Sequence, residues 1–68
     1  MTDRQFVVSI YPDAKCISSK NLTGNELYAI FCINDGKSLS TKWYLARQSA
    51  WYDVSENINR YMMRKLES

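Results

Sequence analysis

Apolar residues recur at three- and four-residue steps through the last third of the chain. The stripe consists of Ala50, Trp51, Val54, Ile58, Tyr61, Met62 and Leu66. This spacing places apolar side chains along one face of an α-helix. We therefore predict a long C-terminal helix, with Ser49 as its N-cap or with a start nearer Ala46. Asp53 and Glu56 are expected to be solvated acids near its positive end.

The pattern changes in the middle of the chain. Residues 14–19 alternate well enough to predict a short strand, and residues 26–33 predict the strongest strand because they are dense in aromatic and β-branched side chains. Asp35-Gly36 then follows, which is typical of a type I′ hairpin turn. Residues 37–44 are therefore expected to return as a third antiparallel strand.

The first segment, residues 3–10, fits two structures. Thr2 and Gln5 have the spacing of a capping box, and Pro12 would end a helix. Three β-branched residues favour a strand instead, namely Val7, Val8 and Ile10. We favour the helix, which gives an α+β fold in one domain over residues 1–68. The expected order is αβββα in two layers, with a three-stranded antiparallel sheet packed on the long C-terminal helix.

A two-residue Asp35-Gly36 turn determines which side chains share a face of the sheet. On one face it pairs Cys32 with Leu39, Ile30 with Thr41 and Tyr28 with Trp43. On the other it pairs Ile33 with Ser38, Phe31 with Ser40, Ala29 with Lys42 and Leu27 with Tyr44. The first set is apolar on both strands, so we expect it to meet the C-terminal helix. Ile17 is expected to join the second set.

Helices on one side of the sheet would leave this second face uncovered. Exposed apolar patches of this kind mark interfaces, and covering one is worth about 25 cal/mol per Å² before association costs. The expected partner-binding residues are Ile17, Leu27, Phe31, Ile33, Lys42 and Tyr44, with Ala29 in the same strip. Two alternatives would remove the patch. The N-terminal segment could fold across it, or a one-residue slip could exchange the two faces.

The sequence offers little catalytic or metal-binding chemistry. It contains no histidine, and no two carboxylates form an obvious pair for general acid–base catalysis. Cys16 and Cys32 lack a histidine partner, and two cysteines cannot complete a zinc site within one chain. Gly24 and Gly36 belong to turns and not to a phosphate-binding loop. We therefore expect a non-enzymatic protein without a metal or cofactor.

Charge and cysteine content indicate the class of partner and the cellular compartment. The 68 residues include 9 basic and 7 acidic side chains, and a net charge of +2 is too small to indicate a dedicated nucleic-acid binder. Two cysteines and no apolar run long enough for a signal peptide or a membrane span indicate a cytoplasmic protein with reduced thiols.

Secondary candidates for partner contacts lie on the predicted C-terminal helix, namely Tyr52, Arg60, Arg64 and Lys65.

Nucleic-acid binding is the alternative function. Phe31 and Tyr44 could stack bases on the sheet, with Lys15 and Lys42 beside them. The predicted order of elements also resembles that of double-stranded RNA-binding domains. Residues 44–47, Tyr-Leu-Ala-Arg, stand where that family has a lysine-rich start to its last helix, so the resemblance stops at topology.

A second resemblance rests on short motifs spread over residues 11–58. They are Tyr11-Pro12-Asp13-Ala14-x-Cys16, the Asp35-Gly36 turn, and Ala50-Trp51-x-Asp53. Together they are similar to motifs of small accessory proteins encoded by bacteriophages and prophages. The resemblance implies a bacterial host cytoplasm and an inhibitor or adaptor that occupies a host protein or a defence complex such as CRISPR–Cas. It implies no functional residues, because the matching positions look structural. A homodimer is the other expected assembly.

Overall fold

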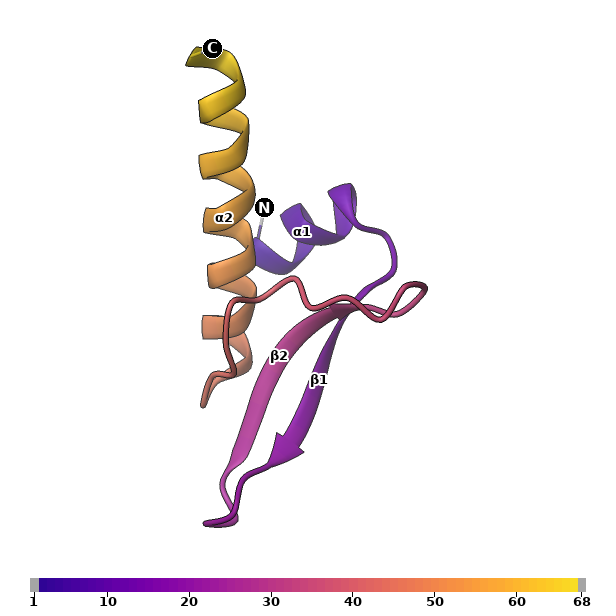
Figure 1. Ribbon diagram of the computed structural model, residues 1–68, viewed down its shortest axis with the longest axis vertical. Coiled ribbons are helices and arrows are strands. Elements are labelled where there is room, and N and C mark those ends of the chain that lie inside the picture. The colour runs from indigo at the N-terminus through magenta and orange to yellow at the C-terminus, as the bar shows by residue number, and fades with distance from the viewer. Residues whose placement is uncertain (1, 68) are drawn as a thin grey trace.

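Residues 2–67 fold into two helices and a β-hairpin (Figure 1). This computed structural model describes the backbone of residues 2–67 and the side chains of residues 2–64. The elements are α1 (Asp3–Ile10), β1 (Ala14–Lys20), β2 (Glu26–Cys32) and α2 (Arg47–Glu67). The fold measures 44 × 22 × 21 Å, because the tip of the hairpin and the end of α2 extend in opposite directions (Figure 1). The predicted α+β class is confirmed.

The N-terminal helix has the predicted bounds and the predicted cap. Thr2 Oγ1 accepts a hydrogen bond from Gln5 N at 3.2 Å, and Gln5 Oε1 accepts one from Thr2 N at 3.0 Å. The Thr2 bond satisfies one of the free N–H groups of the first turn, and the Gln5 bond holds the backbone of the cap itself. The β-branched residues do not prevent the helix, since Val7 gains complete burial in the core.

β1 and β2 pair along their full length as an antiparallel hairpin. Their Cα partners run from Ala14 with Cys32 to Lys20 with Glu26. Asn21 shapes the connecting loop, because its Oδ1 accepts hydrogen bonds from the backbone N of Thr23 and of Asn25, both at 3.0 Å. This arrangement is an Asx turn, which needs no tertiary support.

The core lies between one face of this hairpin and the two helices. Val7 of α1, Ile30 of β2 and Val54 of α2 are its largest fully buried side chains. The remaining buried members of the cluster are Ala14, Ala50 and Trp51. Both helices therefore form one layer and the hairpin forms the other.

Residues 37–44 do not form the predicted third strand, and the sheet of the described chain has two strands. Two isolated bridges attach this segment to β2, joining Phe31 to Ser38 and Tyr28 to Tyr44. Between the bridges β2 advances by three residues and the returning segment by six. The segment therefore bulges away from the strand, and continuous pairing is lost.

The turn that precedes this segment is longer than predicted. Cys32 N donates to Lys37 O at 2.9 Å, and Gly36 N donates to Cys32 O at 2.8 Å, which leaves a loop of residues 33–36. Gly36 has a φ of +69°, whereas Asp35 does not have the positive φ that a type I′ turn requires. The prediction of a two-residue turn was wrong. Phe31 consequently opposes Ser38 and not Ser40.

The C-terminal helix begins earlier than the predicted N-cap. α2 starts at Arg47, which agrees with the Ala46 alternative and places Ser49 inside the helix. Asp53 is therefore beyond the first turn, and its half-buried carboxylate accepts hydrogen bonds from Thr41. The expectation of a solvated first-turn acid was wrong for this residue. Within the described chain, neither helix has the length and hydropathy needed to cross a membrane.

Candidate functional site

The register of the hairpin separates a core face from an outer face. Cys16 pairs with Ile30 and Ser18 with Tyr28, and the side chains of these residues point toward the helices or the space beside them. Ile17 pairs with Ala29 on the opposite side, and Leu27 and Phe31 share that side by alternation. Because both helices pack on the core face, neither covers these residues. We call this set, Ile17, Leu27, Ala29 and Phe31, the outer face.

The returning segment covers part of the outer face. Trp43 lies against Phe31, with ring centroids 5.9 Å apart and planes inclined at 49°. The sequence placed Trp43 opposite Tyr28 on the core face, and the bulge between residues 38 and 44 reverses that assignment. Ala29, predicted as part of the uncovered strip, is fully buried, and Phe31 and Ile17 are half-buried, whereas 41% of Trp43 is exposed. Trp43 is therefore the most accessible aromatic side chain of this face.

The same bulge moves Tyr44 away from the outer face. Tyr44 exchanges two backbone hydrogen bonds with Tyr28, at 2.7 and 2.8 Å, and packs against the core. The prediction that Tyr44 stands beside Leu27 was wrong. Lys42 is exposed, and its Nζ lies 5.5 Å from the centroid of the Tyr44 ring. Ile33 follows β2 in the turn and is 49% exposed.

The secondary candidates on α2 lie apart from the outer face. Tyr52 is 56% exposed, and the neighbouring Glu56 raises the pKa of its hydroxyl through its negative charge and a hydrogen bond. Arg60 and Arg64 are exposed. The side chain of Lys65 lies outside the described residues. These positions do not join the expected partner-binding residues in one surface.

A pocket that sequence reasoning missed lies between α1, the start of α2 and β1. Its volume is about 580 Å³. Its lining includes two arginines, Arg4 and Arg47, and no carboxylate among the side chains that the structure describes. No local sequence pattern indicates this pocket, because Arg4 and Arg47 are remote in sequence and come together only when α1 and α2 pack. We call this site the basic pocket.

The thiol of Cys16 lines the basic pocket together with Ser18. Burial raises the pKa of the Cys16 thiol, and the positive charges of Arg47 and Arg4 lower it by less. The thiol is consequently protonated at neutral pH, which makes it a poor nucleophile. Arg47 also packs on Tyr28, with its Cζ 5.1 Å from the ring centroid. The pocket therefore combines cationic side chains with an aromatic wall.

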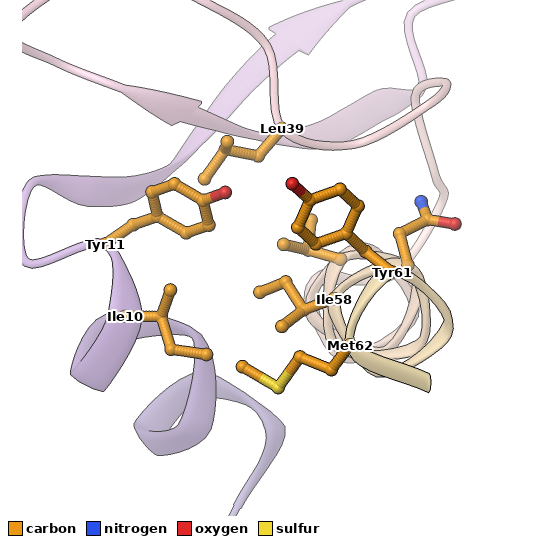
Figure 2. A pocket seen from close by; sticks show the side chains of 8 residues that line it. Ile10, Tyr11, Leu39, Ile58, Tyr61 and Met62 are labelled. Atoms are coloured by element: carbon orange, nitrogen blue, oxygen red, sulfur yellow. The ribbon is translucent and has the colours of Figure 1, made fainter. Parts of the chain in front are cut away.

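A second, apolar pocket of about 390 Å³ separates the end of α1 from α2. Figure 2 shows Ile10 and Tyr11 on one side, Ile58 and Met62 on the other, and Leu39 above them. The α2 stripe predicted these helical residues as a packing face. In the structure the stripe continues past the sheet, so Met62 is 44% exposed.

The described residues contain no group of three or more side chains suited to hold a metal ion. Both Cys16 and Cys32 are free thiols. Comparison with known proteins found no matching family model, no matching curated protein and no matching solved structure.

Proposed function

We propose that this protein is a non-enzymatic protein-binding module whose outer face docks on another protein. The observation that supports the proposal best is the Phe31–Trp43 pair, which stands on a sheet face that neither helix covers. Tryptophan with a half-buried supporting ring is the kind of side chain that dominates binding energy at interfaces. Ile33 and Ile17 extend the apolar area around the pair.

The charges around the outer face favour one kind of partner. Lys15 is exposed and pairs directly with Phe31 across the hairpin, so its charge stands beside the aromatic pair. Lys42, predicted for the same surface, is exposed but lies over the ring of Tyr44, which packs on the core. A complementary surface would carry an apolar centre with an acidic rim. We therefore propose a foreign protein with that surface as the occupant, in preference to a second copy of this basic face.

The biological role that fits such docking is inhibition or bridging by occupancy. A 68-residue chain can cover a functional site of a larger protein without contributing chemistry of its own. We propose an inhibitor or adaptor of the kind that bacteriophages encode, directed at a host protein or a defence complex in the bacterial cytoplasm. The resemblance of residues 11–58 to such accessory proteins is the source of this part of the proposal.

A comparison of three baits tests the docking surface. Wild-type protein, Trp43→Ala and Tyr52→Ala would be used to capture proteins from bacterial lysate, and the retained proteins would be purified and titrated individually. We expect one or more proteins to bind wild type and Tyr52→Ala equally, and to bind Trp43→Ala at least tenfold more weakly. Tyr52 is a matched control because it is an exposed aromatic residue on α2. Equal binding by all three baits would contradict the proposal.

Light scattering tests the occupant. We expect a monomer at high concentration, since two copies of the outer face would each present the positive charge of Lys15. A dimer that Trp43→Ala dissociates would show that a second copy occupies the face, and would replace the foreign partner in the proposal.

Nucleic-acid binding is the second candidate, because the Phe31–Trp43 pair with Lys15 also has the composition of a stacking platform. Tyr44, expected earlier to stack bases, packs on the core instead. Retardation of a single-stranded oligonucleotide that weakens steeply with salt and is lost in Trp43→Ala would favour this candidate. No retardation at low salt would dismiss it.

A further inference from the structure

One edge of the hairpin presents unpaired backbone groups beside the basic pocket. Both the N–H and the C=O of Tyr28 bond to Tyr44, and Ile30 O accepts from Leu39 N. Even-numbered residues of β2 therefore direct their backbone groups away from β1. Their partners in β1, Cys16 and Ser18, belong to the non-hydrogen-bonded pairs of the ladder. The backbone N–H and C=O groups of these two residues therefore point to the outer edge of β1, away from β2.

This edge of β1 has no neighbouring strand within the described chain. No hydrogen bond to the backbone of Cys16 or Ser18 is found outside the hairpin among the described residues. An edge strand with free donors and acceptors is a template for an added extended chain. β1 has seven residues, so it offers room for a segment of about six residues.

The basic pocket lies against the same edge. Cys16 and Ser18 contribute side chains to the pocket, and Arg4 and Arg47 approach it from the two helices. Both arginines are exposed, so an incoming group can reach them. Guanidinium groups bind carboxylates with paired hydrogen bonds, and no carboxylate of the described side chains lines the pocket to compete.

We propose that the basic pocket and the free edge of β1 together bind an extended acidic segment of a partner protein. The segment would extend the sheet through the backbone of Cys16 and Ser18. Side chains of an extended chain alternate between faces, so carboxylates at every second position would point toward Arg4 and Arg47. Apolar pocket walls from Val8 and Trp51 would pack against their methylene groups.

This inference rests on the proposed function, because it names a class of protein partner. It uses a different surface, however, since the pocket is on the core side of the hairpin and Trp43 is on the outer face. A free phosphate or a nucleic acid would use the cations but not the strand edge. The edge therefore favours a peptide.

The test uses a seven-residue peptide with glutamate at alternate positions and threonine or valine between them. A matched peptide carries glutamine in place of each glutamate. Titration into the ¹⁵N-labelled protein should shift the amide signals of Cys16 and Ser18 with the glutamate peptide, and affinity should fall at least tenfold with the glutamine peptide. Binding of both peptides with equal affinity, or shifts confined to other residues, would overturn the proposal.

Charge variants separate the pocket from general electrostatics. The double substitution R4Q and R47Q should weaken binding of the glutamate peptide at least tenfold, since two charge-assisted contacts are removed. Lys42→Gln is the matched control because Lys42 lies over Tyr44 and does not line the pocket. An equal effect of Lys42→Gln and of either single arginine substitution would contradict a specific site.

A proline substitution tests the strand edge. Ser18→Pro removes an N–H that points out of the hairpin, and proline is tolerated on edge strands at such positions. We expect peptide affinity to fall at least fivefold relative to Ser18→Ala, which loses the same hydroxyl but keeps the N–H. If Ser18→Pro is unfolded, peptide-dependent slowing of hydrogen exchange at Cys16 and Ser18 in the wild-type protein replaces it. If the peptide does not slow exchange at these two amides, strand addition is excluded. It is also excluded if an oligonucleotide of equal charge displaces the peptide at a concentration lower than that of the peptide.

The outcomes also separate this inference from the proposed function. Loss of natural-partner binding in Trp43→Ala, combined with no peptide binding, would leave docking through the outer face intact and reject the acidic segment. Peptide binding combined with no effect of Trp43→Ala on any captured protein would do the reverse.

Discussion

The carboxylate of Asp53 holds the backbone and the side chain of Thr41 at the same time. Asp53 Oδ2 accepts a hydrogen bond from Thr41 N at 2.8 Å and another from Thr41 Oγ1 at 3.0 Å. These bonds connect the second turn of α2 to the middle of the returning segment. Trp43 follows two residues later, so the position of the aromatic pair on the outer face depends on this contact.

Asp53→Ala should loosen the segment that carries Trp43. We expect the free energy of unfolding to fall by about 1–2 kcal/mol, since two hydrogen bonds to a charged acceptor are lost at a partly exposed site. Hydrogen exchange of the Thr41 amide should accelerate, and acrylamide should quench Trp43 more strongly in a Trp51→Phe background. Glu56→Ala is the control, and a similar effect on Thr41 exchange from that variant would contradict the assignment.

Gly36 is the residue at which the turn depends on glycine. Its φ is +69°, and an added Cβ would meet no atom within 4 Å, so a substitution there changes backbone strain and not packing. Gly36→Ala should lower the free energy of unfolding in urea by about 1–2 kcal/mol. Gly36→Asn should cost clearly less, because asparagine tolerates left-handed backbone. Equal losses in both variants would point to a cause other than φ.

The elements defined by local interactions were predictable from the sequence. Thr2 and Gln5 form the capping box that their spacing indicates, and Asn21 closes its loop through its own neighbours. The alternation within residues 14–20 and 26–32 placed Ile30 in the core and Phe31 on the other face, because adjacent residues of a strand must point in opposite directions.

The third strand could not be predicted correctly, because its pairing depends on contacts distant in sequence. Asp35-Gly36 has the composition of a two-residue turn, yet Cys32 and Lys37 close a longer loop. Thr41 then bonds to Asp53 instead of continuing a ladder. No local sequence pattern indicates that Thr41 bonds to Asp53 in place of pairing with β2. The basic pocket was missed for the same reason, since Arg4 and Arg47 are brought together only by helix packing.

Stability should decrease in alkaline solution because of the two thiols. Burial is the main cause of the raised pKa of Cys16 and also of Cys32, where Asp13 and Asp35 add a negative charge. Below the ordinary thiol pKa of 9.0 both states keep the proton, and stability is unaffected. Above it the unfolded chain loses protons that the folded chain retains, so the free energy of unfolding falls as pH rises through the folded pKa.

Urea unfolding between pH 7 and 10 measures this loss, because thiols and tyrosine hydroxyls ordinarily begin to lose their protons in this range. A variant with Cys16→Ala and Cys32→Ala should show a flatter decline than wild type. Tyr28 and Tyr52 also have a raised pKa, the first mainly from its hydrogen bond to Glu26 and the second mainly from the charge of Glu56. Raised tyrosine pKa values also lower stability in alkaline solution, so part of the decline should persist in the cysteine-free protein. An identical decline in both proteins would contradict the contribution of the thiols.

Apolar residues of α2 differ in how much they stabilise the fold, and one substitution in the stripe and one beside it measure the difference. Ile58 is half-buried and packs against the core, whereas Met63 is 61% exposed. Ile58→Ala should lower the free energy of unfolding by about 2 kcal/mol, the lower end for an aliphatic truncation because burial is incomplete. Met63→Ala should change it by less than about 0.5 kcal/mol. A large loss of unfolding free energy in Met63→Ala, at a concentration where the protein is a monomer, would mean that the end of α2 packs on the fold more closely than its exposure indicates. If that loss depends on protein concentration, the protein associates through this end of the helix.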